Sequence, residues 1–211
     1  MPTLPEPPTP GELARIRLED GDTPVLAAGT LLWRIYFLGG PHRQRWNTFR
    51  TFGPTDSRFD HHLEPQRGQA RGILYAARDG ATCFAEAFQR TRTINRTRRR
   101  PWLVGFRLAR GVPVLSLAGN WPTRAGASMA INSASRARAR RWSRAIYDAY
   151  PKVQGLLYCS KMNRNEPALA LYERAERALP ESPEFNRPLN DPGLAGPILA
   201  AARRLGYLVL P

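Results

Sequence analysis

The sequence has few of the residues and segments that define several common classes of protein. Only two cysteines and three histidines occur among 211 residues, and they lack the spacing of a metal site. No run of about 18 apolar residues is present that could cross a bilayer as a helix. Five of the first ten residues are prolines, where a secretion signal would have a charged and then an apolar start. We therefore expect a cytoplasmic protein with reduced thiols, no metal and no membrane partner.

Acidic residues are scarce relative to basic ones. The chain has 17 Asp and Glu against 32 Lys and Arg, which gives a formal net charge of +15 and a pI of about 11.1. Such an excess favours nucleic acid, a phosphorylated ligand or an acidic protein as a partner. A GC-rich genome also raises the arginine content without any function, so the charge alone does not choose among these explanations.

Several sequence motifs are absent. There is no Gly-rich phosphate loop ending in Lys-Ser or Lys-Thr, no Gly-x-Gly-x-x-Gly after a strand and no Gly-x-Ser-x-Gly elbow. The usual nucleotide-binding and hydrolase classes are thereby excluded. The arginine-rich segments 90–110 and 136–144 lack regularly interleaved aromatic residues and any helix-turn-helix or zinc pattern. A basic nucleic-acid-binding module nevertheless stays open as an alternative to an enzyme.

The chain is long enough for one sizeable core and one domain, because 42% of its residues are hydrophobic. We expect residues 1–29 to form a Pro-rich, partly disordered arm and residues 30–211 to form a single α+β domain. Strands are predicted over 31–38, 102–106, 112–117, 155–160 and 207–210, and helices over 135–150, 169–179 and 194–205. Residues 42–71 and 180–192 are predicted to be loops.

The stretch 72–88 organises this prediction. It is expected to hold a buried strand, a tight Asp79-Gly80 turn and a helix with Thr82 as its N-cap. Tyr75 and Glu86 would then lie on adjoining elements. A carboxylate among the apolar neighbours of Glu86 costs desolvation unless a donor or a cation faces it, which indicates a site. The alternative is a Glu on the exposed face of the helix.

Three further polar residues lie where a site is expected. Arg34 interrupts the first predicted strand, where it lies either on a solvated sheet face or in a cleft that binds an anion. Arg58 stands beside Phe59 in a long loop, and Ser160 ends the strand that begins at Gly155. His61 and His62, in the same long loop, are expected at the surface.

Taken in order, these residues resemble the RES domain family, which is named for its Arg, Glu and Ser. The resemblance covers most of residues 31–210, with Ser57 where the family tends to have glycine. Ser133 and Ser135 stay open as alternatives for the family serine. The matching pieces are Trp33-Arg34, Ser57-Arg58-Phe59, Gly72-Ile-Leu-Tyr-Ala-Ala77, Phe84-Ala85-Glu86 and Gly155-Leu-Leu-Tyr-Cys-Ser160.

The resemblance implies a fold and an activity. Similar proteins are toxins of bacterial toxin-antitoxin pairs that degrade NAD by hydrolysis or phosphorolysis, on an ADP-ribosyltransferase-like fold of mixed twisted sheets with flanking helices. By resemblance Glu86, Arg34 and Ser160 are catalytic, and Arg58 and Tyr75 bind substrate. NAD is then a substrate and no cofactor is expected, with inorganic phosphate as the alternative to water.

The resemblance also implies partners. An acidic or Xre-type antitoxin is expected, with nucleic acid contacted only through that antitoxin. Transfer of ADP-ribose to a macromolecule stays open as an alternative reaction. The oligomeric state is open as well, a homo-oligomer being one alternative.

Overall fold

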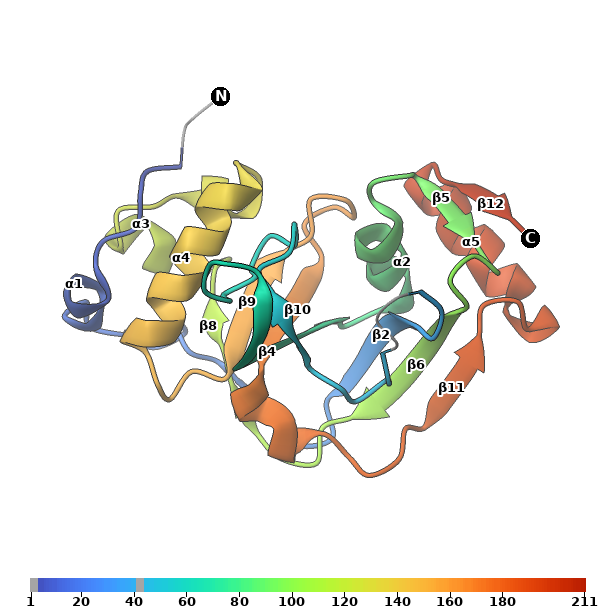
Figure 1. Ribbon diagram of the computed structural model, residues 1–211, viewed down its shortest axis with the longest axis horizontal. Coiled ribbons are helices and arrows are strands. Elements are labelled where there is room, and N and C mark those ends of the chain that lie inside the picture. The colour runs from blue at the N-terminus through green and yellow to red at the C-terminus, as the bar shows by residue number, and fades with distance from the viewer. Residues whose placement is uncertain (1–3, 41–43) are drawn as a thin grey trace.

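The computed structural model describes residues 4–40 and 44–211 and is built around an eight-stranded sheet (Figure 1). The strands follow the order β11-β6-β2-β4-β10-β9-β8, and β3 pairs with β4 beside this path. All neighbours are antiparallel except β8 and β9. The α+β class expected from the sequence is therefore observed, with mixed strand directions. The strands are β2 (Leu31–Phe37), β3 (Arg50–Gly53), β4 (Arg67–Ala77), β6 (Pro101–Arg107), β8 (Leu115–Ser116), β9 (Gly155–Cys159), β10 (Pro167–Tyr172) and β11 (Phe185–Pro188).

The sheet divides into two wings between β2 and β4. These strands share a single paired position, Trp33 with Ala77, whereas β2 pairs with β6 from Leu31 to Phe37. On the other side β4 pairs with β10 from Ile73 to Ala77. Figure 1 shows the two wings diverging from this junction. The helix α2 (Gly80–Phe88) follows β4 directly and packs on β2, so it links the wings where they separate.

Helices cover the outer faces of both wings. The amphipathic α4 (Arg136–Ala149) places Trp142 and Ile146 in a core with β9 and β10, as its apolar spacing predicted. The second wing is covered by α2 and α5 (Ala195–Leu205), which share a core around Phe84 and Ile198. A third core, which includes Leu32, contains residues of both wings.

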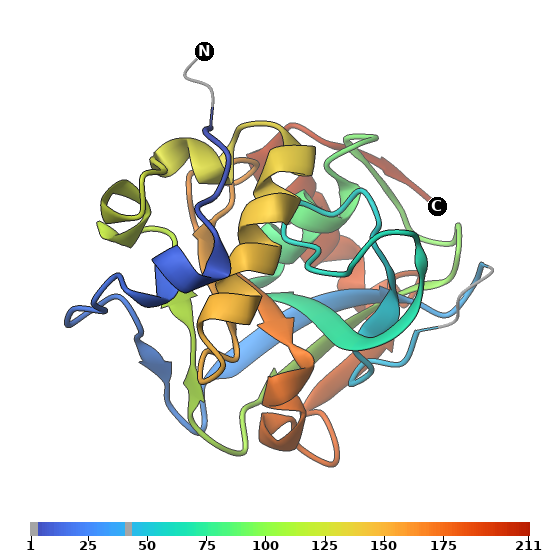
Figure 2. The ribbon, with the colours of Figure 1, turned by 60° about the vertical axis from the view of Figure 1, so that its left-hand side comes forward.

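The N-terminal segment is packed from Leu4 onward, although we expected a partly disordered arm. Figure 2 shows it lying along α4. The helix α1 (Pro10–Ala14) opens with a capping box between Thr9 and Glu12, and Leu13 is fully buried. The indole Nε1 of Trp142 donates to the Pro5 carbonyl at 2.8 Å. Residues 1–3 lie outside the described residues.

The predicted helix over 169–179 is wrong. The chain forms strand β10 there and then a 3-10 helix, η2 (Glu173–Ala178). Residues 168–172 are buried on both sides of the sheet, because β10 lies between β4 and β9. A strand covered on both faces is apolar without alternation and therefore resembles a buried helix in sequence.

The remaining elements are short and lie at the edges of the two wings. The segment expected to be one strand over 112–117 is divided into β7 and β8. Among the described residues, none of the helices is long and apolar enough to cross a membrane. Two small sheets join β1 to β7 and β12 to β5. These elements are β1 (Val25–Leu26), β5 (Thr93–Asn95), β7 (Val112–Pro113), α3 (Trp121–Arg124), η1 (Met129–Asn132), η3 (Pro192–Leu194) and β12 (Leu208–Leu210).

Candidate active site

The centre of the candidate site is the carboxylate of Glu86. Glu86 is half-buried on α2, and the Ser160 hydroxyl, fully buried at the end of β9, donates to its Oε1 at 2.6 Å. The hydroxyl of Tyr158, on the same strand, donates to Oε2 at 3.3 Å. The structure thus brings together two predicted residues that are 74 positions apart in the sequence. Glu86 is not on the fully exposed face of its helix.

The start of α2 is held by a cap that differs from the prediction. Asp79, and not Thr82, is the N-cap, and its carboxylate accepts hydrogen bonds from the Thr82 amide at 2.9 Å and hydroxyl at 2.6 Å. The Thr82 oxygen in turn accepts a hydrogen bond from Asn163 Nδ2 at 2.8 Å. Asn163 lies in the turn after Ser160, so this contact ties the helix of Glu86 to the segment of Ser160.

The charge of Arg58 interacts with this carboxylate. Arg58 is half-buried, and its Nη1 donates to the Ala134 carbonyl at 2.5 Å. Burial, with the charge of Arg136, lowers the pKa of Arg58, and the nearby Glu86 opposes that shift. The guanidinium therefore shares the electrostatic environment of Glu86.

Tyr75 contacts the segment that carries Arg58. Its hydroxyl accepts a hydrogen bond from the Phe59 amide at 3.3 Å, and the Phe59 ring packs against Tyr158 with ring centroids 4.8 Å apart. Burial raises the pKa of Tyr75, and the charges of Asp60 and Glu86 raise it further. The hydroxyl consequently stays protonated at neutral pH.

Arg34 lies across the junction, on β2. It is only 5% exposed, so it is not on a solvated sheet face. Its Nη1 donates to the carbonyls of Trp46 at 3.2 Å and Thr48 at 3.3 Å. Among residues 4–40 and 44–211 no carboxylate lies within 4.0 Å of it.

The buried charge of Arg34 has an electrostatic consequence. Burial lowers the pKa of Arg34 to about 10, although Tyr36 and Cys83 oppose the shift. Cys83 lies on α2 one turn before Glu86. Burial raises the pKa of its thiol, the charge of Glu86 raises it further, and the charge of Arg34 opposes the shift. Arg34 thus lies beneath the same helix as Glu86 but does not contact the carboxylate directly. A buried guanidinium with only carbonyl partners is well suited to bind an anion.

The sequence-based search missed two groups that contact Glu86. Tyr158 stands two positions before Ser160, and side chains two apart in a strand share a face, which was the available signal. Gln89 follows Glu86 by three positions on the helix, and its amide nitrogen donates to the Glu86 carbonyl at 2.9 Å. Its oxygen accepts from Arg136 Nη2 at 2.9 Å.

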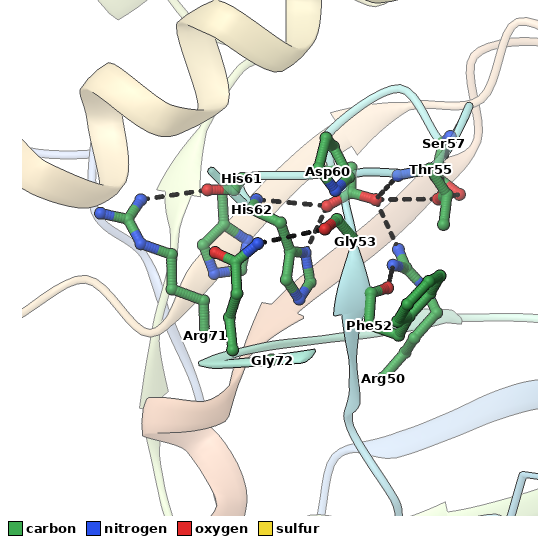
Figure 3. Close-up of polar contacts among 12 residues, drawn as sticks. Arg50, Phe52, Gly53, Thr55, Ser57, Asp60, His61, His62, Arg71 and Gly72 are labelled. Atoms are coloured by element: carbon green, nitrogen blue, oxygen red, sulfur yellow. Dashed lines mark hydrogen bonds and ion pairs between the residues drawn. The ribbon is translucent and has the colours of Figure 1, made fainter. Parts of the chain in front are cut away.

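The two histidines of the long loop were placed wrongly at the surface. His61 and His62 are both fully buried. His62 contacts the carboxylate of Asp60, which Figure 3 shows between His62 and Arg50. His61 stacks on Tyr147 with ring centroids 4.4 Å apart. The sequence carried no signal for this burial, because the rings that cover His61, Tyr147 and Tyr172, come from the distant elements α4 and β10.

The alternative serines make no hydrogen bond to this carboxylate in the described contacts. Ser133 and Ser135 are both exposed and precede α4, and neither has a hydrogen bond to Glu86 among the described residues. Ser160 is therefore the serine that the structure pairs with Glu86.

The two arginine-rich segments differ in the structure. Arg98, Arg99 and Arg100 are exposed, as expected for a solvated turn. The arginines of α4 are instead half-buried, and four of the five form ion pairs within the chain. These pairs are Arg136 and Arg140 with Asp56 at 2.9 and 3.5 Å, and Arg138 and Arg141 with Glu6 at 3.1 and 2.7 Å.

Two surface hollows lie near other parts of the chain. One of about 330 Å³ is lined by Asp56 and Arg140, and one of about 470 Å³ by Tyr150 and Lys152. Neither is lined by Glu86, so the candidate site rests on its converging side chains and not on cavity size. In the part of the chain that the structure describes, no group of three or more His, Cys, Asp or Glu could hold a metal ion.

Comparison with known proteins gave one family and one structure of note. The model of the family described as the RES domain matches residues 31–190. No curated protein matches the chain. A chain in the crystal structure of the M. tuberculosis MbcT-MbcA toxin-antitoxin complex aligns with a TM-score of 0.49 and 15% sequence identity, over 79% of this chain and 87% of that chain.

Proposed function

Because this chain belongs to the RES domain family, we propose that it is an enzyme that degrades NAD by cleaving the bond between nicotinamide and ribose. The observation that carries the proposal is the pair of Glu86 and Ser160, whose side chains meet at 2.6 Å. We also propose that the fold is ADP-ribosyltransferase-like. The observed sheet, which is mixed and divided into two wings, is compatible with that fold.

Glu86 would stabilise the transition state. As the nicotinamide leaves with the electron pair of the bond, positive charge develops on the ribose ring, and a nearby carboxylate stabilises it electrostatically. The same carboxylate can accept a hydrogen bond from a ribose hydroxyl. Ser160 and Tyr158 donate to its two oxygens, and these bonds hold the carboxylate in one orientation before substrate binds.

Arg34 and Arg58 would bind phosphate groups. A guanidinium makes two parallel hydrogen bonds to a phosphate, and it does so more strongly where water is excluded. Arg34 is buried without a carboxylate partner in the described residues, and Arg58 lies near Glu86. We assign them to the pyrophosphate of NAD or to an attacking inorganic phosphate. The ring of Tyr75 would pack against nicotinamide.

The attacking group decides the product. Water would give ADP-ribose, and inorganic phosphate would give a phosphorylated ADP-ribose, with nicotinamide released in both reactions. The test is incubation of the purified protein with NAD, with and without phosphate, followed by identification of the products. Absence of released nicotinamide under both conditions would refute the proposal. Label transferred from NAD to a protein or nucleic acid would instead indicate ADP-ribosyl transfer.

In the cell this activity would make the protein a cytoplasmic toxin. An acidic antitoxin is the partner we propose, because the chain carries a net charge of +15 and exposes Arg98, Arg99 and Arg100. Expression of the wild-type protein should lower cellular NAD and stop growth. Expression of the Glu86→Gln variant should do neither, which separates loss of NAD from a general effect of a basic protein.

A further inference from the structure

The carboxylate of Asp60, in the loop before β4, is buried and accepts several hydrogen bonds. It is fully buried. Its Oδ2 accepts from Arg50 Nη2 at 2.8 Å, from the Thr55 amide at 2.6 Å and from the Thr55 hydroxyl at 2.8 Å. Its Oδ1 accepts from the His62 amide at 3.2 Å and contacts His62 Nδ1. Figure 3 shows these partners converging on Asp60 from both sides.

The Asp60 carboxylate is held in its charged form by these partners. Burial alone would raise the pKa of Asp60, but the hydrogen bonds from His62 and Thr55 and the charge of Arg50 hold it far below its usual range. A buried carboxylate with this many donors fixes the backbone around it, because each lost bond would leave a polar group unsatisfied. We call residues 54–62 the Asp60 loop.

The Asp60 loop connects this carboxylate to the candidate site. Arg58 stands two positions before Asp60, with Phe59 between them. The Phe59 amide donates to the Tyr75 hydroxyl, and its carbonyl accepts from Ser143 Oγ at 2.8 Å. The backbone between Asp60 and Arg58 is thus fixed by β4 and α4, while the guanidinium of Arg58 donates to the Ala134 carbonyl at 2.5 Å and its charge interacts with that of Glu86.

We propose that Asp60 is a positioning residue, which holds Arg58 in the orientation that substrate binding requires. This inference rests on the proposed function and deepens it. The sequence had assigned no role to Asp60. Asp60 does not contact the Glu86 carboxylate in the described structure, and its effect is transmitted through the Phe59 backbone. Removing its charge should loosen the Asp60 loop and lower the affinity of the site for a phosphate-bearing substrate.

The first test measures the loop without using activity. Amide hydrogen exchange is compared between the wild type, Asp60→Asn and a control, Asp22→Asn. Asp22 is a matched residue, because it is also buried, accepts from a backbone amide and pairs with Arg124. Faster exchange over residues 54–62 in Asp60→Asn alone supports the proposal. Unchanged exchange there, or equal loosening in both variants, overturns it.

The second test measures the coupling to Arg58. Steady-state kinetics with NAD are compared among the wild type, Asp60→Asn, Arg58→Ala and the double variant. We expect Asp60→Asn to lower kcat/KM about tenfold, mainly through KM, and to have less than about a twofold effect when Arg58 is already Ala, since residues acting as one unit are not additive. Equal effects in both backgrounds would show a role in stability only and overturn the proposal.

The two tests separate this inference from the proposed function. A wild-type protein that does not cleave NAD refutes the proposed function, and the exchange experiment then decides alone whether Asp60 anchors the loop. An active wild type with additive variants refutes the role of Asp60 and leaves the proposed function standing. Circular dichroism of every variant checks that the fold is kept.

Discussion

Ser160 donates a hydrogen bond to Glu86 at 2.6 Å, from the end of β9 to the middle of α2. The contact is possible because β9 lies one strand away from β4 in the sheet, with β10 between them, and α2 begins directly after β4. A serine that follows a strand and a glutamate about two helical turns past the Asp79 cap are thus positioned by regular structure on both sides. Such placement gives a reactive group a defined geometry before substrate arrives.

The first prediction concerns the charge of Glu86. Glu86→Gln keeps the size of the side chain, replaces one of its two accepting oxygens with a donor, and removes the negative charge that stabilises the developing cation. We expect NAD cleavage to fall by about 100-fold or more, the scale for loss of one electrostatic partner of a transition state. Initial-rate measurements of released nicotinamide check this. The control is Glu184→Gln, an exposed carboxylate paired with Arg107, and near wild-type turnover in Glu86→Gln would exclude Glu86 from the catalytic residues.

The second prediction distinguishes Ser160 from the other serines. Ser160→Ala removes the 2.6 Å donor to Glu86, so we expect NAD cleavage to fall about tenfold or more, as for other oriented hydrogen bonds of an active site. Ser133→Ala and Ser135→Ala, both at exposed positions, should stay within about twofold of the wild type, because exposed substitutions rarely disturb the fold. A larger loss in either of them than in Ser160→Ala would reassign the family serine.

Local sequence signals predicted the elements that carry Glu86 and Ser160. The strand, the Asp79-Gly80 turn and the helix over 72–88 were all predicted, because alternation, turn residues and helical spacing are properties of neighbours in the chain. Alternation along a strand also accounts for Arg34 and Tyr36 sharing one face of β2, but the burial of that face did not follow from it, because a solvated face was an equal alternative. The RES domain resemblance, carried by short motifs near each element, is confirmed by the family match over residues 31–190.

Other features depended on neighbours that are distant in sequence. Residues 169–172 form a strand because β4 and β9 pair with it from both sides, and no local pattern reveals those partners. His61 is buried by Tyr147 and Tyr172, which come from α4 and β10. The ion pairs of Glu6 with Arg138 and Arg141 likewise join segments that are more than a hundred positions apart, so the arm could not be placed from its own composition.

The third prediction concerns Arg34 and Arg58. Each Arg→Lys variant keeps the positive charge but loses the planar pair of donors that contacts a phosphate at two points. We expect KM for NAD to rise about tenfold or more in each, with circular dichroism unchanged. The control is Arg107→Lys, at an exposed position on β6. If Lys is tolerated at either 34 or 58, that arginine has a structural role only and does not bind the substrate.

The fourth prediction separates partner binding from turnover. Arg98, Arg99 and Arg100 are exposed, and Glu86 has no contact with them in the described structure. Replacing all three with Ser should therefore leave NAD cleavage within a few-fold of the wild type. The same change should weaken binding of an acidic polymer such as polyglutamate at low salt, where screening is least.

The matched control for this variant changes the net charge equally at other exposed sites, Arg15, Arg17 and Arg110. If residues 98–100 form a docking surface, only the first triple variant should lose binding to polyglutamate. Equal losses in both triple variants would mean that the affinity for polyglutamate depends on the net charge of the whole chain. Loss of turnover in a folded first variant would place these arginines at the substrate. Tight duplex DNA binding with a steep salt dependence, without NAD cleavage, would favour a nucleic-acid-binding function, because each phosphate contact releases counterions.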